Sequence, residues 1–294
     1  MLALLCALGL STIAASAQMQ PLQIAFTWDD LPAHSALPAN TTRVEIGRKL
    51  IAAMKEAKLP PAYGFVNGVQ LANEPLSEPM LREWRAAGFP LGNHAWSHMN
   101  LNQRPLEDWE ADVLKNEPVL EKYAAGSDWH WLRYPYLAMG ETAEKRLGAR
   151  KFLAAHGYRI ADVTMSFGDY MYNDPYARCV AKKDAAAIAK LEESYLKMAD
   201  ETVDYARAVT KATWGREIPY VLLMHVGAMD AEMLPRLIAL YKKRGFEFVT
   251  LEEAEKDPAY ASDLNLSLPE PARTYSTPVP PPPHPDFDVN AVCK

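Results

Sequence analysis

The chain has 294 residues, of which 49% are hydrophobic and 23% are charged, and this is the composition of a globular protein. Its 31 basic and 37 acidic residues give a formal net charge of −6. Because binding to a phosphate backbone requires a basic surface, we expect no nucleic-acid partner. The length is compatible with two domains or with one α/β barrel.

The amino terminus has the features of a secretory signal. An apolar run covers residues 2–15, and Ala15-Ser16-Ala17 forms the small-x-small pattern that precedes signal-peptidase cleavage. We expect residues 1–17 to be a signal peptide cleaved after Ala17, and the mature protein to be secreted or periplasmic. No basic residue precedes the run, so a buried helix or an uncleaved anchor remains the alternative. No later apolar run approaches the roughly 20 residues of a membrane span, so we expect no stable membrane insertion after cleavage.

The three cysteines are divided by that cleavage. Cys6 would leave with the signal, whereas Cys179 and Cys293 would remain in an oxidising compartment. These two either form a disulfide or stay as a buried thiol and a free thiol in the tail, and spacing alone does not decide. No motif ties a histidine to Cys179, so a nucleophilic role for it is not expected.

From about Leu22 onward, short apolar runs alternate with segments of helical period, which predicts repeated βα units. The expected fold class is α/β, a distorted (β/α) barrel similar to a TIM barrel, with about seven parallel strands. A longer helical stretch, Asp184–Trp214, is an addition to that pattern. The expected strands are Gln23–Thr27, Ala62–Val66, Pro90–Gly92, Trp131–Leu132, Arg159–Thr164, Tyr220–Leu223 and Phe246–Thr250.

The regular pattern stops after Asp263. Residues 278–285 are almost all proline, and proline cannot donate to a sheet ladder. We therefore predict one folded domain over residues 18–263 and an extended, polyproline-like surface tail over residues 264–294.

Polar side chains follow the predicted strands. Because the carboxyl ends of parallel strands share one face of a barrel, we expect these residues to meet in one pocket. Taken singly, each has an ordinary explanation as a helix cap or a packed side chain. The residues are Asp29, Asp30, Asn67, His94, Arg133, Asp169 and His225.

The spacing of His94 and His98 indicates a metal site. In a helical turn, positions i and i+4 lie on one face, close enough for two imidazoles to bind one ion. A carboxylate from Asp29 or Asp30 would complete a set of two histidines and one carboxylate, leaving the other carboxylate as a base. We expect a divalent cation, with zinc first and cobalt, nickel or manganese as alternatives.

Five motifs in order make the region from about Leu22 to Asp257 resemble the polysaccharide deacetylases of carbohydrate esterase family 4, the NodB-homology group. The resemblance implies that residues 18–263 form a catalytic domain that removes acetyl groups from a glycan. The motifs are Thr27-Trp28-Asp29-Asp30, His94-Ala95-Trp96-Ser97-His98, Arg133-Tyr134-Pro135-Tyr136, Gly168-Asp169-Tyr170 and Leu222-Leu223-Met224-His225.

The resemblance also implies a role for each site residue. Asp30, His94 and His98 would bind the metal. Asp29 would be the base, held by Arg133, and His225 would be the acid, positioned by Asp169. The backbone N–H of Tyr136 would face the oxyanion.

The chain departs from the family pattern around the pocket. Leu31-Pro32 replaces the usual glycine after the aspartate pair, Ala95 replaces a serine or threonine, and Tyr170 replaces a tryptophan. These changes leave the substrate open. Aromatic residues near the strand ends either stack on sugar rings or pack in the core; they are Trp28, Trp96, Tyr136, Tyr170 and Tyr172.

Two other functions remain open. The first is hydrolysis of a small amide, a ring amide or an O-acetyl ester, with residues 184–214 restricting access to the groove. The second is carbohydrate binding without catalysis. Among the remaining histidines, His34 lies four residues past Asp30 and either borders the pocket or, as we expect, occupies a solvated loop position. The sequence identifies no partner for His130, His156 and His284.

Overall fold

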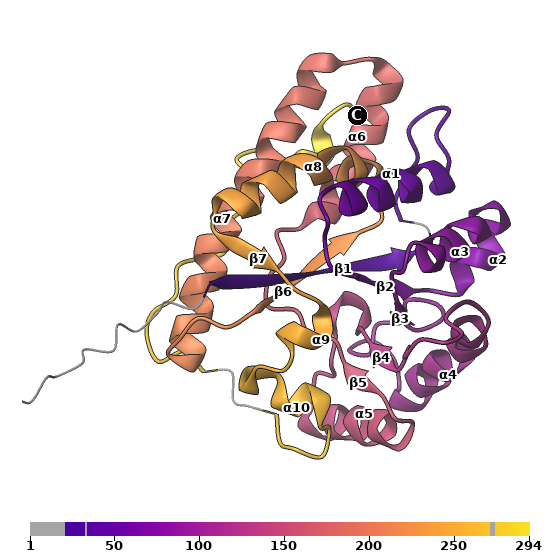
Figure 1. Cartoon of the computed structure of the whole chain (residues 1–294), viewed down its shortest axis with the longest axis vertical. Coiled ribbons are helices and arrows are strands. Elements are labelled where there is room, and N and C mark those ends of the chain that lie inside the picture. Colours follow the sequence, from indigo (N-terminus) through magenta and orange to yellow (C-terminus); the bar gives the residue numbers. More distant parts are fainter. Residues whose placement is uncertain (1–20, 33, 271–273) are drawn as a thin grey trace, which may run out of the picture.

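Seven parallel strands form the centre of the protein in the computed structural model, which describes residues 21–32, 34–270 and 274–294. Their order is β5-β4-β3-β2-β1-β6, and β7 pairs with β1 (Figure 1). The strands are β1 Leu22–Leu31, β2 Tyr63–Val66, β3 Leu91–Asn93, β4 Trp131–Leu132, β5 Arg159–Ile160, β6 Tyr220–His225 and β7 Phe246–Phe248. The predicted signal peptide, residues 1–17, lies outside the described residues.

The sheet curls into a half-barrel, which confirms the predicted distorted barrel of about seven parallel strands. Beyond β5 the chain bends toward the opposite edge of the sheet, where Met165 forms an isolated parallel bridge with Leu222 of β6. The fifth expected strand, Arg159–Thr164, is therefore shorter than predicted, because β5 ends at Ile160. The first is longer, because β1 continues past Thr27 to Leu31.

The central strand β1 is buried on both faces, as is typical of a parallel sheet. Successive side chains alternate between the two faces. Ile24, Phe26 and Trp28 belong to the core cluster that includes residues of α1 (Arg43–Glu56) and α8 (Ala228–Lys243). Ala25 belongs to the cluster inside the barrel. By the same alternation, Asp29 at the end of β1 faces the barrel interior.

Helices cover the outer face of the sheet (Figure 1). A capping box between Thr42 and Glu45 starts α1, which satisfies two otherwise unpaired backbone N–H groups. No helix within the described ranges is both long and apolar enough to cross a membrane. The remaining α-helices are α2 Val69–Asn73, α3 Glu78–Ala86, α4 Leu106–Tyr123, α5 Ala143–Ala155, α6 Asn173–Lys182, α7 Ala185–Trp214, α9 Leu251–Ala254 and α10 Ala261–Leu264.

Helix α7 is the added helical stretch that the sequence predicts at residues 184–214. Its first turn is capped by Asp184, whose carboxylate accepts from the N–H of Ala187. It ends at Gly215, where a φ of 70° gives the left-handed conformation that favours glycine. Between these ends α7 packs against α6 and α8.

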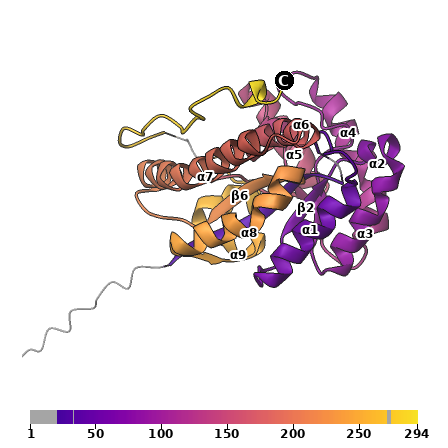
Figure 2. The same cartoon turned by 90° about the horizontal axis from the view of Figure 1, so that it is seen from above.

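The tail runs over the surface along α7 toward α6 (Figure 2). The N–H of Ser276 donates to the carbonyl of Ala212 over 2.8 Å, and Asp286 forms an ion pair with Lys197. Near the end of the tail, Cys293 forms a disulfide with Cys179 of α6. Of the two alternatives for these cysteines, the structure contains the disulfide.

Replacing Cys293 by Ser should lower the free energy of unfolding by about 2–5 kcal/mol. The two cysteines are 114 residues apart, so the cross-link strongly restricts the unfolded chain. Urea denaturation without reductant would measure the difference, and the reduced wild type should unfold like the variant. Identical unfolding of variant, reduced wild type and oxidised wild type would contradict the prediction.

Candidate metal centre and active site

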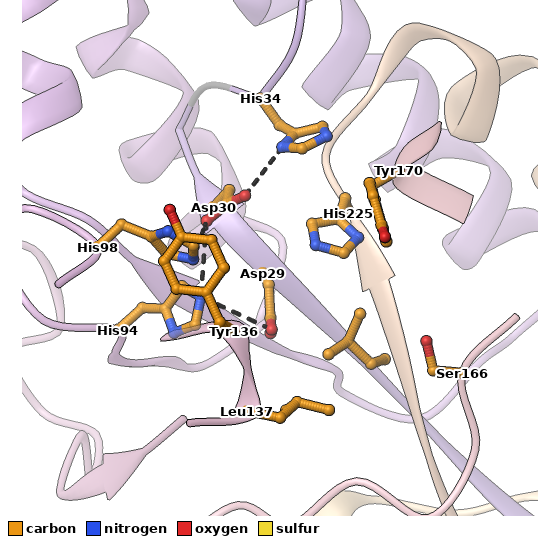
Figure 3. Close-up of a pocket in the computed structure, with 11 residues that line it drawn as sticks. Asp29, Asp30, His34, His94, His98, Tyr136, Leu137, Ser166, Tyr170 and His225 are labelled. Atoms are coloured by element: carbon orange, nitrogen blue, oxygen red, sulfur yellow. Dashed lines mark hydrogen bonds and ion pairs between the residues drawn. The ribbon is translucent and has the colours of Figure 1, made fainter. Parts of the chain in front are cut away.

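A cavity of about 450 Å³ opens at the carboxyl ends of the strands (Figure 3), the face where barrels of this kind carry their chemistry. Its volume is in the range of small-molecule sites. It is lined by Asp29, Asp30, His34, His94, His98, Tyr136, Leu137, Ser166, Tyr170, Leu223 and His225.

Two adjacent carboxylates on β1 reach the same cavity, although alternation along a regular strand would send them to opposite faces. Asp29 faces the barrel interior with Thr27. Asp30 has a φ of 64°, and the pairing of β1 with β2 changes register between Trp28 and Leu31. This irregularity turns the second carboxylate toward the first.

The two histidines of the HxxxH motif meet through a loop. The prediction of a helical turn is wrong, because residues 94–98 contain no helix and Ala95 and His98 have φ values of 58° and 56°. The imidazole centroids are nevertheless only 4.8 Å apart. The side-chain amide of Asn67 supports this loop by donating to the carbonyls of His94 and Ala95.

Asp30, His94 and His98 form the one cluster of potential metal ligands found among the described residues. Oδ1 of Asp30 lies 3.5 Å from Nε2 of His94 and 3.5 Å from Nε2 of His98. Donors bound tetrahedrally at about 2.0–2.1 Å stand about 3.3–3.4 Å from each other. The donor atoms and their spacing therefore fit one divalent cation.

Each histidine can present Nε2 to a metal ion. Nδ1 of His94 lies 2.8 Å from the carbonyl oxygen of Arg133, which can only accept, so Nδ1 is the donor and Nε2 is the ring nitrogen that faces Asp30. Burial and the neighbouring His94 lower the pKa of His98 to about 4, so its imidazole is neutral at neutral pH.

The carboxylate of Asp30 is in its ionised form. Burial alone would raise the pKa of Asp30, but the hydrogen bond from His34 and the positive charge of His225 hold it below its usual range. An ionised carboxylate is the form that binds a cation.

Asp29 is held by a buried arginine. The guanidinium of Arg133 donates to Asp29 Oδ1 and Thr27 Oγ1, each over 3.0 Å, and to the carbonyl of Ala161 over 2.8 Å. The second oxygen of Asp29, Oδ2, lies 3.7 Å from Nε2 of His94. One oxygen of Asp29 is thus fixed by the arginine, and the other faces the metal ligands.

His225 closes the opposite side of the cavity. Its backbone N–H donates to Asp169 Oδ2 over 2.6 Å, and its Nδ1 lies 3.1 and 3.2 Å from the two Asp169 oxygens. Burial alone would lower the pKa of His225, but the charge and hydrogen bonding of Asp169 raise it to about 10. The imidazole is therefore protonated at neutral pH, with Nδ1 bound to Asp169.

Two of the five aromatic residues singled out in the sequence line the cavity. Tyr136 and Tyr170 are 64% and 51% exposed, and the Tyr136 ring lies 4.3 Å from the His98 ring. Trp28 and Tyr172 are buried in the core. Trp96 instead packs over Gly68 and under the ammonium group of Lys115.

His34 does not occupy the solvated loop position expected from the sequence. It lines the cavity, and its Nδ1 lies 2.8 Å from Asp30 Oδ2. Leu223 was also not singled out, although it stands two residues before His225 on β6 and so faces the same side. No residue of α7 lines the cavity, so the structure does not support the alternative in which residues 184–214 restrict access to the groove.

Residues 17–161 match the family model "Polysaccharide deacetylase". A chitin deacetylase from Colletotrichum lindemuthianum is similar in structure, with 23% identity, a TM-score of 0.54, and 80% of this chain and 88% of that chain covered. A polysaccharide deacetylase from Bacillus cereus has 19% identity and a TM-score of 0.53, with 79% and 92% covered.

A third structure is a mutant described as a pseudoenzyme of carbohydrate esterase family 4 with restored enzymatic activity. It has 15% identity and a TM-score of 0.53, with 80% of this chain and 68% of that chain covered. No curated protein matches the sequence. At these identities the solved structures establish the fold, and the family model covers the segment that carries both aspartates, both ligand histidines and the arginine. Residues 17–161 belong to the polysaccharide deacetylase family.

Proposed function

We propose that the protein is a metal-dependent hydrolase that removes acetyl groups from an N-acetylated or O-acetylated carbohydrate. The observation that carries this proposal is the position of Asp30 Oδ1, 3.5 Å from Nε2 of both His94 and His98. Asp29 and His225 border the same cavity. One structural neighbour is described as a pseudoenzyme, but here the candidate base and acid accompany the ligands, which supports an active enzyme.

Asp30, His94 and His98 would hold the cation, with zinc proposed first and cobalt, nickel or manganese as alternatives. The bound ion would polarise the acetyl carbonyl and lower the pKa of a water molecule in the cavity. Asp29, kept in place by Arg133, takes a proton from the attacking water. The backbone N–H of Tyr136 is proposed to stabilise the oxyanion.

His225 then acts as the acid. Because Asp169 favours the imidazolium, the ring can donate a proton to the departing amine or alcohol. The products are acetate and the deacetylated substrate. The exposed rings of Tyr136 and Tyr170 at the cavity are proposed to contact the sugar. With the signal peptide proposed for residues 1–17, the substrate would be met outside the cytoplasm.

Acetate release tests the proposal. Full-length mature protein would be stripped with a chelator, reloaded with Zn²⁺, and assayed on chito-oligosaccharides, peptidoglycan fragments, acetylated xylan and a small ring amide. We expect release from one of the acetylated glycans that is lost on chelation and restored by metal. Hydrolysis of the ring amide alone would favour the amidohydrolase, and binding without turnover of any substrate would favour a non-catalytic protein.

Replacing Asp169 by Asn should move the alkaline limb of the activity profile to lower pH. Activity requires protonated His225 and therefore falls as the pH rises through its pKa, which Asp169 raises to about 10. Removing that charge lowers this pKa, so the variant loses activity at a lower pH. Profiles of kcat/KM from pH 6 to 11 would measure the shift, and an unchanged alkaline limb would contradict this role of Asp169.

A further inference from the structure

We propose that His34 is a positioning residue that fixes the orientation of the metal ligand Asp30. This inference rests on the proposed metal site and adds a residue that lies outside all five sequence motifs. It is carried by the contacts of the two Asp30 oxygens and by the burial of the His34 ring.

The two oxygens of Asp30 have different partners. Oδ1 faces Nε2 of His94 and Nε2 of His98, whereas Oδ2 lies 2.8 Å from Nδ1 of His34 (Figure 3). An ionised carboxylate only accepts hydrogen bonds, so Nδ1 of His34 is the donor. This bond opposes rotation of the carboxylate and leaves Oδ1 as the oxygen presented to a cation.

The His34 side chain is largely buried, and its polar contact is with Asp30. It is 16% exposed, its Nε2 is buried without a hydrogen-bond partner among the described residues, and its ring centroid is 4.7 Å from that of His225. Within the described chain, its side-chain hydrogen bond is to Asp30. The ring is therefore confined between the metal ligand and the candidate acid.

The backbone around His34 is held from two sides. Arg43 of α1 donates to the His34 carbonyl over 2.6 Å and forms two hydrogen bonds of 2.9 Å with the Glu74 carboxylate. The N–H of Ala36 donates to Asp174 of α6 over 2.7 Å. These contacts attach the segment that carries His34 to two helices, so the imidazole is presented to Asp30 from a fixed position.

Outer partners of metal ligands typically contribute about 10–100-fold to metal affinity. We therefore expect His34→Ala to weaken Co²⁺ binding by about 10–100-fold and to change the visible absorption of bound Co²⁺, which reports ligand geometry. His34→Gln retains an N–H donor and should recover much of the wild-type affinity and spectrum. The matched control is His284→Ala, which removes an exposed histidine of the tail and should change neither.

The experiment measures Co²⁺ affinity by competition with a fluorescent chelator, together with urea unfolding of each metal-free protein. A purely structural role would lower metal-free stability in both His34 variants, without rescue of affinity by Gln. Wild-type Co²⁺ affinity in His34→Ala, with binding lost in Asp30→Ala, would overturn the inference and leave the metal site standing. Unchanged binding in Asp30→Ala would instead overturn the metal site itself.

Discussion

Replacing Asp29 by Asn should lower kcat for acetate release by about 10²–10⁴-fold, the usual contribution of a general base. The amide cannot take a proton from water. It keeps the size of the side chain and an oxygen that can accept from Arg133, so the fold and the ligands Asp30, His94 and His98 should persist. Steady-state kinetics together with metal analysis would show low kcat at wild-type metal content.

The control for this variant is Asp108→Asn, which makes the same change at an exposed position in the first turn of α4. It should retain wild-type kcat. If Asp29→Asn also retained wild-type kcat while fully loaded with metal, Asp29 would not be the base. Loss of metal from Asp29→Asn would instead show that this carboxylate takes part in holding the ion.

Replacing Arg133 by Met should lower the free energy of unfolding by about 3–5 kcal/mol, the usual result of removing one partner of a buried ion pair. Arg133 is fully buried, and its loss leaves the Asp29 carboxylate without its cation and the carbonyl of Ala161 without a donor. Activity should fall as well, because Asp29 is no longer held. Urea denaturation and acetate release would measure the two effects.

Arg48→Met provides the contrast. Arg48 also pairs with a carboxylate, Glu83, but its side chain is 61% exposed, so its removal should change stability by less than about 1 kcal/mol. Equal stability losses in the two variants would contradict the importance of the buried pair. Arg133→Lys should be only partly active, because a single ammonium cannot reproduce the three-way hydrogen bonding of the guanidinium.

The fold class was predictable from the sequence because it depends on the spacing of apolar residues and on the residues that begin and end each element. The alternation of apolar runs with helical segments predicted the parallel strands, and residues 184–214 form the long helix where it was expected. The positions of the predicted strands indicated which polar side chains stand at the strand ends. Such features involve residues that are close together in the chain, so they can be recognised from the sequence.

The details of the site were less predictable because they depend on backbone irregularities. The positive φ of Asp30 and the register shift in β1 bring two adjacent carboxylates to the same cavity. No residue type in the sequence indicates either irregularity. Positive φ values at Ala95 and His98 likewise allow a loop to bring the two imidazoles together, where the i, i+4 spacing predicted a helical turn. Backbone strain of this kind concentrates at functional sites.

His34 shows the same limit for a single side chain. Its spacing from Asp30 is visible in the sequence, but the position of its backbone depends on hydrogen bonds formed in the folded chain. Arg43 donates to the carbonyl of His34, 9 residues away, and Asp174 accepts from the N–H of Ala36, 138 residues away. A tertiary contact of that kind leaves no local pattern. The disulfide between Cys179 and Cys293 was undecided for the same reason, since pairing depends on the distance between Cα atoms in the folded chain.

The most direct test of the proposed metal centre is anomalous diffraction from crystals of the full-length mature protein loaded with Zn²⁺. The geometry predicts one anomalous peak at about 2.0–2.2 Å from Asp30 Oδ1, His94 Nε2 and His98 Nε2, with His225 across the cavity. A peak bound by other residues, or fully loaded protein without a peak at these three atoms, would contradict the proposed function.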